Sequence, residues 1–319
     1  MQNNILRKIK YLFLYCRFGK TFVPDTIFSS RLFNSIMRLI HFKEHSIRKK
    51  IPIIQEDKKI ENNIGFKVID ENLIFNNDQL KSLSYLKEKF NYINWIDDQD
   101  VNRKKEFLLM KSIQIDSNLK NIIDGLLPIV SNYIGSLPVL HDASFWYSPN
   151  MINEKGRSQS WHMDSEDVKQ LKVMIPIDEI TEDNGPLNVI AANKSEKVYK
   201  KLIKKKIVNK RNIKLDDEIM EDNMGESNFI NLITIKKNQI AFVDTCRCYH
   251  YGSRKSKKPR KLLMLHFTSA YSLYMPIFRR KMYFSDYSKN ISSLIYGFRN
   301  NNFYAFNNIN IKKWNFKIL

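Results

Sequence analysis

Short apolar segments separated by turn signals fill the chain from residue 139 to residue 269, and they constrain the fold more than any other feature. The segments are rich in Val, Ile, Leu and Phe, which is typical of strands, and Asp183-Asn184-Gly185-Pro186 is a strong turn signal between two of them. Antiparallel strands at this density predict a sandwich or a barrel, and the mouth of a small barrel can hold a small ligand. The predicted strands are residues 139–147, 159–164, 171–177, 187–190, 229–235, 239–244 and 261–269.

The residues before this region predict a supporting layer of helices. Strands are expected at 64–69 and 107–115. The expected helices run from a cap at Asn77 or Asp78 to about Phe90, and from a cap at Ser117 to Tyr133. Helices that precede a strand-rich half are typical of cover for one face of a sheet. The predicted fold class is therefore mainly β with supporting helices, an α+β arrangement.

Two segments carry most of the net charge of +20. Residues 1–50 hold eleven Lys and Arg and two acids, and residues 193–214 hold ten and one, so each segment nets +9. The second segment lies in a Lys-rich insert, residues 193–228, that interrupts the strand series. Two interpretations stay open: these segments bind an acidic partner such as phosphate, anionic lipid or a CoA-like carrier, or they are solvated faces in a Lys-rich composition.

The chain is expected to divide into a domain with two extensions. Residues 51–275 form the domain that contains the insert, and residues 43–62 are expected to be a linker. Residues 1–50 form a basic helical extension, whose amphipathic patterns either pack on the domain or lie on an anionic membrane surface. Residues 276–319 are an aromatic-rich extension that is expected to pack on the domain rather than bind nucleic acid.

Three features favour a cytoplasmic setting. No apolar run approaches the length of a membrane span, and the N-terminal residues lack the pattern of a secretory signal. Three cysteines cannot build a disulfide framework, so a reducing compartment fits best. The pair Cys246 and Cys248 is expected to consist of ordinary strand or loop residues.

The stretch Gln159–Asp167 contains the pattern His162-x-Asp164. If this stretch is extended, both side chains project from the same side and can converge on one ion. Downstream, His250 follows one predicted strand and Arg260 begins the next. Two histidines and one carboxylate on one face of an octahedral metal leave three positions open, which suits non-haem Fe(II) oxygenases. A 2-oxo acid can fill two of these positions and O2 the third, while an arginine binds the far carboxylate.

This region resembles the phytanoyl-CoA dioxygenase-like family of Fe(II)/2-oxoglutarate-dependent oxygenases. The resemblance covers residues 139–270 and, more loosely, residues 64–138. The stretches that carry it are Gln159–Asp167, Leu171–Ile175, Glu182–Leu187, Asp244-Thr245, His250–Ser253 and Pro259-Arg260. It implies a double-stranded β-helix, a jelly-roll barrel of the cupin-like kind, that uses Fe(II), 2-oxoglutarate and O2.

The resemblance also implies roles for individual residues. His162, Asp164 and His250 match the iron ligands that form the catalytic centre, and Arg260 matches the residue that binds the 2-oxoglutarate carboxylate. Further contacts with 2-oxoglutarate are expected from Met174, from the backbone of Gly252 and from Tyr147. Related halogenases have a small residue in place of the carboxylate ligand, so Asp164 favours hydroxylation.

The expected function is that of an Fe(II)- and 2-oxoglutarate-dependent dioxygenase. It would hydroxylate an aliphatic C–H bond of a small or carrier-bound metabolite, for which the basic insert suggests an anionic group, and decarboxylate 2-oxoglutarate to succinate. The alternative is a non-catalytic barrel that acts in binding or at a membrane surface. The roles of four residues stay open. Glu166 and Asp167 are either groups behind the metal ligands or exposed acids. Arg247 and Arg254 either bind an acidic substrate or are solvated or internally paired. The other histidines are expected to be surface or strand residues: His41, His45, His141 and His266.

Overall fold

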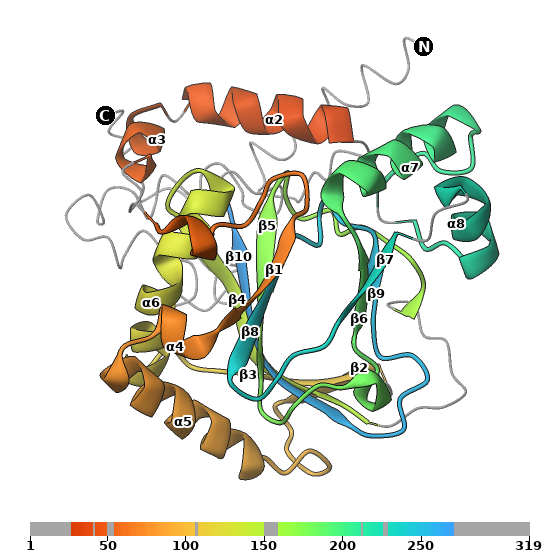
Figure 1. Cartoon of the computed structure of the whole chain (residues 1–319). Coiled ribbons are helices and arrows are strands. Elements are labelled where there is room, and N and C mark those ends of the chain that lie inside the picture. Colours follow the sequence, from red (N-terminus) through yellow and green to blue (C-terminus); the bar gives the residue numbers. More distant parts are fainter. Residues whose placement is uncertain are drawn as a thin grey trace, which may run out of the picture.

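The computed structural model describes residues 27–40, 42–49, 54–105, 108–149, 159–211, 213–225 and 229–270. The helices are α2 (Ile27–Ile40), α3 (Phe42–Arg48), α4 (Glu71–Ile74), α5 (Asn77–Asn91), α6 (Ser117–Ile134), α7 (Ala192–Lys204) and α8 (Asp217–Met224), with short 3-10 turns at Glu56–Lys58 and Glu182–Asn184. The strands are β1 (Phe66–Asp70), β2 (Val101–Lys105), β3 (Leu108–Ser112), β4 (Val139–Ser148), β5 (Gln170–Pro176), β6 (Leu187–Ile190), β7 (Ile230–Ile233), β8 (Gln239–Val243), β9 (His250–Tyr251) and β10 (Arg260–Thr268). Figure 1 shows their arrangement.

The strands of the described residues form two antiparallel sheets. The larger sheet has the order β1-β8-β5-β10-β4-β3-β2, and the smaller has the order β7-β6-β9. From β5 onward the chain passes between the sheets: β5 is in the larger sheet, β6 and β7 in the smaller, β8 in the larger, β9 in the smaller and β10 in the larger. This alternation defines a jelly roll, the double-stranded β-helix. The predicted fold class is confirmed.

Most predicted strands agree with the structure within one or two residues, because each is an apolar run bounded by turn residues. The predicted strand 159–164 is instead a pair of isolated bridges, from Trp161 to Leu215 and from His162 to His250. Two observed strands were not predicted: β2 is short and highly charged, and β9 has only two residues.

The prediction of a linker over residues 43–62 is wrong where it overlaps α3, whose Arg48 is buried. The helix caps lie one residue earlier than predicted. Asn76 caps α5, since its side chain accepts a hydrogen bond from the backbone of Gln79, and Asp116 caps α6 in the same way through Leu119. A capping side chain belongs to the residue before the first helical turn, which periodicity alone places only to within a residue or two.

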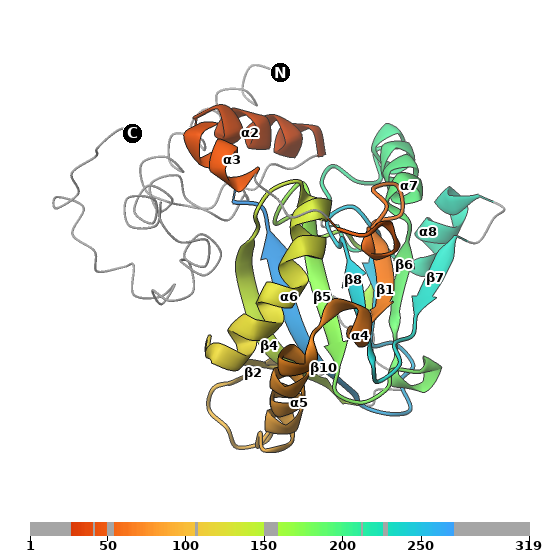
Figure 2. The ribbon, with the colours of Figure 1, turned by 60° about the vertical axis from the view of Figure 1, so that its left-hand side comes forward.

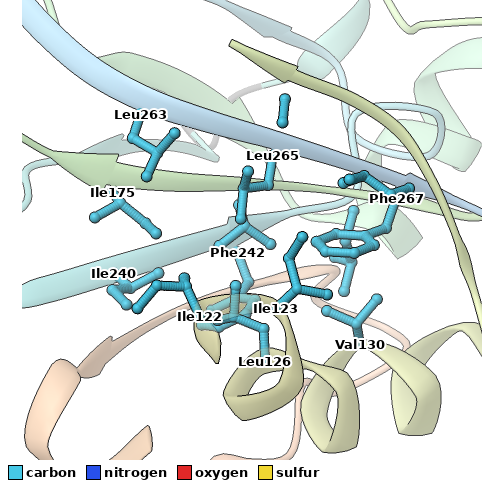
Figure 3. Close-up of a cluster of buried hydrophobic side chains, with 14 of the residues drawn as sticks. Ile122, Ile123, Leu126, Val130, Ile175, Ile240, Phe242, Leu263, Leu265 and Phe267 are labelled. Atoms are coloured by element: carbon cyan, nitrogen blue, oxygen red, sulfur yellow. The ribbon is translucent and has the colours of Figure 1, made fainter. Parts of the chain in front are cut away.

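The largest core lies between helix α6 and the outer face of the larger sheet. Side chains from one stripe of α6, spaced three and four residues apart, are fully buried against β5, β8 and β10 (Figure 3). Among them, Ile122 and Leu126 are 0% exposed and lie close to Ile240 and Phe242. This core fixes the sheet from outside and leaves its inner face available for a site.

The Lys-rich insert lies against the outer side of the smaller sheet (Figure 1). Val198, Tyr199 and Leu202 of α7 are buried in a cluster with Trp161 and Met220. The insert is therefore a packed layer, and it reaches the interior of the barrel through Lys214, which lines the cavity described below.

The described part of the N-terminal extension packs on the barrel through its polar residues. Asn34 of α2 donates hydrogen bonds to Asp167 (3.3 Å) and Ser269 (3.4 Å), and Arg48 exchanges hydrogen bonds with Leu137. Figure 2 shows α2 and α3 above one end of the larger sheet. The amphipathic pattern over 4–18 and the C-terminal extension 276–319 lie outside the described residues. Within the described ranges, no helix combines the length and the apolarity required to cross a membrane.

Candidate metal centre

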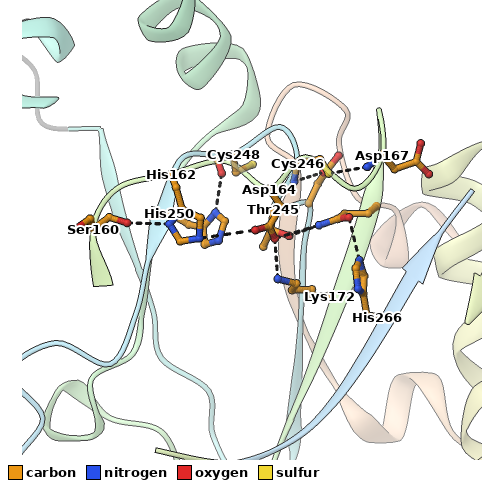
Figure 4. Close-up of polar contacts among 12 residues, drawn as sticks. Ser160, His162, Asp164, Asp167, Lys172, Thr245, Cys246, Cys248, His250 and His266 are labelled. Carbon is orange, nitrogen blue, oxygen red and sulfur yellow. Dashed lines mark hydrogen bonds and ion pairs between the residues drawn. The ribbon is translucent and has the colours of Figure 1, made fainter. Parts of the chain in front are cut away.

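Backbone pairing brings the three predicted ligands together. His162 and His250 exchange backbone hydrogen bonds of 3.2 and 3.0 Å, which places β9 directly beside the bridge residues. Two residues further on, the backbone N–H of Asp164 donates to the carbonyl of Thr245 (2.8 Å). Because His162 and Asp164 are two residues apart in extended chain, both side chains project to the same side as His250 (Figure 4).

Each histidine ring is oriented by a local hydrogen bond. Nδ1 of His162 lies 2.8 Å from the carbonyl oxygen of Ser160, and Nδ1 of His250 lies 3.0 Å from that of Cys248. A carbonyl oxygen only accepts, so in both rings Nδ1 carries the proton and Nε2 keeps its lone pair. That is the tautomer that binds a metal through Nε2, with the other nitrogen held by a backbone carbonyl.

Burial keeps both imidazoles in the neutral form that binds metals. Burial, and then the proximity of His250, lowers the pKa of His162 to about 2. Burial lowers the pKa of His250 to about 4, although Asp164 acts in the opposite direction. At neutral pH both rings are therefore uncharged, and no proton has to be displaced before a cation binds.

The carboxylate of Asp164 has one oxygen occupied and one available. Lys172 Nζ lies 2.7 Å from Oδ2, and Gln170 Nε2 donates to the same oxygen at 3.2 Å. Burial opposes ionisation of Asp164, but Lys172 and the two histidines outweigh it, so the pKa of Asp164 stays well below its usual value. The other oxygen, Oδ1, lies 3.7 Å from Nε2 of His162.

These atoms fit one metal ion. The ligand atoms of His162, Asp164 and His250 lie within 4.8 Å of one another. Ligands bound at about 2.1 Å on one face of an octahedral ion lie roughly 3 Å apart, so the side chains would have to draw together around the ion, Oδ1 of Asp164 and Nε2 of His162 from 3.7 Å. Two neutral imidazoles and one carboxylate on one side of an ion make the facial donor set that suits non-haem Fe(II).

A polar network behind Asp164 holds it in place. Gln170, which is fully buried, donates through Nε2 to Thr245 Oγ1 (2.6 Å) as well as to Asp164, and its Oε1 lies 2.9 Å from Nε2 of His266. These residues come from the neighbouring strands β5 and β10 and from the loop after β8. A fully satisfied buried network of this kind restricts the carboxylate to one orientation.

Arg260 is buried at the other end of the cavity. Its Nη1 donates to the carbonyl of Gly185 (2.9 Å), and its Nη2 donates to the hydroxyl of Ser253. Gly185 has φ +60°, and a Cβ there would lie 2.9 Å from the Cα of Ser253, so the Asn184-Gly185 turn requires glycine to make this contact.

The charge of Arg260 has no acidic partner among the described residues. Its Nε is buried and lacks a hydrogen-bond partner within the described chain. Burial lowers the pKa of Arg260 to about 10, which still leaves the guanidinium charged at neutral pH. A buried, charged group without a counter-ion is costly, and an anionic ligand would offset that cost. Arg260 therefore fits a carboxylate.

The ligands and Arg260 line one cavity of about 470 Å³ between the two sheets. Met174, Gly252 and Ser253 also line it, as do apolar side chains of β3, β4, β6 and β10. A Cβ at Gly252 would lie 3.1 Å from Nη1 of Arg260, so glycine leaves room at the arginine. The cavity thus combines a metal-binding end, an arginine end and an apolar wall.

One predicted contact does not reach this cavity. Tyr147 lies on the opposite face of β4, where its ring stacks on Trp95 with centroids 5.5 Å apart. Its neighbour Trp146 faces the cavity instead, since successive side chains of a strand point to opposite faces. Tyr147 belongs to the core beneath the helices and is not part of the candidate site.

The structure also decides the open roles of the two acids. Glu166 lines the cavity and Asp167 is completely buried, so neither is an ordinary exposed acid. Burial and the nearby charge of Asp164 raise the pKa of Glu166 to about 7.

The two arginines are engaged within the protein. Arg254 forms an ion pair with Asp217 at 2.6 Å and covers the ring of Tyr251, while Arg247 donates to the hydroxyl of Tyr133. Cys246 and Cys248 are free and buried, as expected of ordinary structural cysteines.

Sequence reasoning missed three polar residues of the cavity region: Lys172, Gln170 and Lys214. A signal existed for the first two. Gln170 and Lys172 alternate with Leu171, Val173 and Ile175 along β5. They therefore share one face of the strand with Met174, which is predicted to face the 2-oxo acid. Lys214 offered no such signal, because it reaches the cavity from the insert.

No family model and no curated protein matches this chain. Among solved structures, EctD from S. alaskensis with bound Fe is 16% identical over 69% of this chain and 78% of that chain, with a TM-score of 0.43. HygX from Streptomyces hygroscopicus with nickel and 2-oxoglutarate bound is 11% identical over 69% and 88%, with a TM-score of 0.44. SnoN, a non-heme alpha ketoglutarate dependent epimerase from nogalamycin biosynthesis, is 10% identical over 65% and 80%, with a TM-score of 0.41. These similarities concern the fold alone.

Proposed function

We propose that this protein is an Fe(II)- and 2-oxoglutarate-dependent dioxygenase that hydroxylates an aliphatic C–H bond of a small or carrier-bound metabolite. The observation that carries the proposal is the shared cavity. One end presents Nε2 of His162, Nε2 of His250 and Oδ1 of Asp164, and the other end presents the buried charge of Arg260. A dicarboxylic 2-oxo acid has the two matching ends.

Each residue then has a defined task. His162, Asp164 and His250 would hold Fe(II), and Arg260 with Ser253 would bind the far carboxylate of 2-oxoglutarate through charge-assisted hydrogen bonds. When bound, the metal and the 2-oxo acid supply the activation of O2, including decarboxylation to succinate. The protein orients the reactants and limits access of water, because the ligand end of the cavity is buried between the two sheets.

The position of the substrate is proposed from the remaining wall of the cavity. Trp146, Met110 and Leu108 offer an apolar surface, and the indole N–H of Trp146 is already bonded to Ser144 (2.8 Å). An aliphatic part of a substrate packs well on such a surface. Lys214, on the side of the insert, is the group toward which an anionic part of the substrate would point.

Turnover of 2-oxoglutarate tests this function. The purified protein with Fe(II) and O2 is expected to convert 2-oxoglutarate to succinate, slowly without substrate and faster with the correct metabolite from a screened pool. Asp164→Ala and His250→Ala are expected to abolish succinate formation, whereas the exposed His141→Ala serves as the matched histidine control. Activity that survives both ligand substitutions would reject the proposal. Absence of Fe(II) and 2-oxoglutarate binding would favour the non-catalytic alternative.

A further inference from the structure

Helix α2 presents an apolar stripe to solvent. Phe28, Leu32, Ile36 and Leu39 are all exposed, with Phe28 and Leu39 at 76% and 75%. Their spacing of four, four and three residues places them on one face of the helix. Phe42 of α3, which is 63% exposed, follows three residues later. Isolated exposed apolar residues are normal on protein surfaces, but a continuous stripe of this length marks an interaction site.

The opposite face of α2 is fixed to the barrel. Ser30 and Asn34 are buried there, and Asn34 bonds to Asp167 and Ser269. Arg211 from the insert donates to the hydroxyl of Ser30 (2.7 Å). These contacts turn Ser30 and Asn34 toward the protein and leave the stripe from Phe28 to Leu39 facing outward. The stripe therefore cannot be buried by simply rotating the helix onto its own domain.

A strongly basic surface adjoins this stripe. Arg31 of α2 lies 3.5 Å from Glu196 of α7, so the two helices meet near their N-terminal ends. Figures 1 and 2 show α2 and α7 along the same end of the molecule. Helix α7 and the turn after it carry exposed lysines at positions Lys197, Lys200, Lys201, Lys204, Lys205 and Lys206. An exposed apolar stripe beside clustered lysines suits an anionic lipid surface.

Charge and apolarity together favour an anionic lipid surface over the other possible partners of the stripe. Residues 271–319 hold eight Lys and Arg and one Asp, so the chain's own C-terminal segment has the same sign as the basic surface. A second copy of the chain would bring an equally basic surface. A nucleic acid would match the charge but would leave the apolar stripe exposed to water. An anionic bilayer matches both, with lysines at the headgroups and apolar side chains at the acyl boundary.

We propose that α2 and the lysine-bearing face of α7 dock this protein on an anionic membrane surface, with the stripe from Phe28 to Leu39 inserted at the headgroup level. This proposal does not depend on the oxygenase activity, because none of the stripe residues lines the cavity.

Sedimentation of the full-length protein with lipid vesicles tests the proposal. The protein is expected to bind vesicles of phosphatidylcholine containing about a third phosphatidylglycerol, and to bind pure phosphatidylcholine vesicles at least about tenfold more weakly. Higher salt should weaken binding, because the lysines contribute through charge. The double variant Leu32→Glu/Leu39→Glu is expected to reduce binding about tenfold or more. Lys204→Glu/Lys205→Glu should reduce it and flatten the salt dependence.

Matched controls come from the other end of the molecule. Leu73 and Tyr85 are about half exposed and belong to α4 and α5, which Figure 1 shows on the opposite side of the molecule from α2, so Leu73→Glu/Tyr85→Glu should bind vesicles as the wild type does. Unchanged melting temperatures would show that all variants fold. Equal binding to neutral vesicles, or full binding by Leu32→Glu/Leu39→Glu, would overturn the proposal. So would a dimer that this variant abolishes without any binding of the wild type to vesicles, because the stripe would then belong to a second copy.

Discussion

Lys172 is the residue that most clearly acts through another residue. Its ammonium group lies 2.7 Å from Oδ2 of Asp164, and its side chain, 17% exposed, lines the cavity from the otherwise buried strand β5. Burial opposes the charge on Lys172, but Asp164 and Glu166 outweigh it and raise the pKa of Lys172. Lys172 thereby occupies one oxygen of Asp164 and leaves Oδ1 available, so we propose that it positions Asp164 for a metal.

Replacing Lys172 is expected to weaken metal binding. Lys172→Met should lower the affinity for Fe(II), or for Co(II) as a stable substitute, by about 10- to 100-fold, which is typical for loss of a group that orients a ligand. Lys172→Arg should recover part of that loss, since it keeps the charge. Anaerobic calorimetry provides the measurement, and Lys261→Met, on the outward face of β10, is the control. Unchanged affinity in a folded Lys172→Met protein would contradict this role.

Arg260 is expected to affect 2-oxoglutarate and not the metal. Arg260→Gln removes a charge-assisted pair worth roughly 2 kcal/mol, so the KM for 2-oxoglutarate should rise about 30-fold. Arg260→Lys should recover little, because a lysine cannot donate to Gly185, to Ser253 and to a carboxylate in the same planar geometry. Metal affinity measured on the same variants serves as the control. A parallel loss of metal binding would show that Arg260 supports the fold of the site instead.

At the scale of elements, the loop after Asp164 is joined to both α2 and β10 by one buried acid. Asp167 accepts hydrogen bonds from the backbone of Val168 (2.7 Å) and of Ser269 (2.6 Å), and from the side chain of Asn34. Arg211 of the insert donates to the carbonyl of Asp167. Four segments that are distant in sequence therefore meet close to the candidate ligand Asp164.

Asp167 is expected to make stability depend on pH. Burial raises its pKa to about 6, although the hydrogen bonds from Ser269 and Val168 act in the opposite direction. Between about pH 4 and pH 6 the folded state then binds more protons than the unfolded state, so the free energy of unfolding falls as pH rises, by up to about 3 kcal/mol.

The variant Asp167→Asn isolates this effect. The variant lacks the titrating carboxyl group of Asp167. The free energy of unfolding of the wild type, relative to that of the variant, should therefore be highest near pH 4 and fall as the pH rises to 7. Urea denaturation across this range measures the difference. Comparing the two proteins cancels the opposite slope that His162 and His250 contribute, because their lowered pKa values are common to both. A difference that is constant with pH would contradict the raised pKa of Asp167.

The sequence predicts elements better than it predicts which side chains meet. The strands of the jelly roll were predicted because each is a continuous apolar run between turn residues. Trp146 and Tyr147 show the limit. Alternation states that they lie on opposite faces of β4, but the choice of face depends on the register with β10, where Leu262 pairs with Trp146 and Arg260 with Ser148. That register joins residues more than a hundred positions apart, and no local pattern encodes it.

The candidate site also contains some residues that the sequence predicts and others that it does not. His162, Asp164, His250 and Arg260 were predicted by residue type and by resemblance, and the structure brings all four to one cavity. Lys214 was not predicted, because only the packing of the insert brings it to the barrel.

At the scale of the whole molecule, the fold separates three tasks. The helices α5 and α6 stabilise the outer face of the larger sheet, the space between the sheets holds the candidate site, and α2 with α7 forms the basic, partly apolar end of the molecule (Figures 1 and 2). The net charge of +20 is accordingly not spread evenly. The exposed lysines of the insert lie on its outer surface, whereas Lys172 and Arg260 line the cavity, where Lys172 pairs with Asp164.

We propose that His162, Asp164, His250 and Arg260 together form one binding site for Fe(II) and 2-oxoglutarate. The most direct test is anaerobic titration of the protein with 2-oxoglutarate in the presence and absence of Fe(II). If the claim is right, the metal tightens 2-oxoglutarate binding by at least about tenfold, because chelation adds to the contact with Arg260, and His162→Ala removes that gain. The same affinity with and without Fe(II), in a protein that binds both, would show two separate sites and contradict the claim.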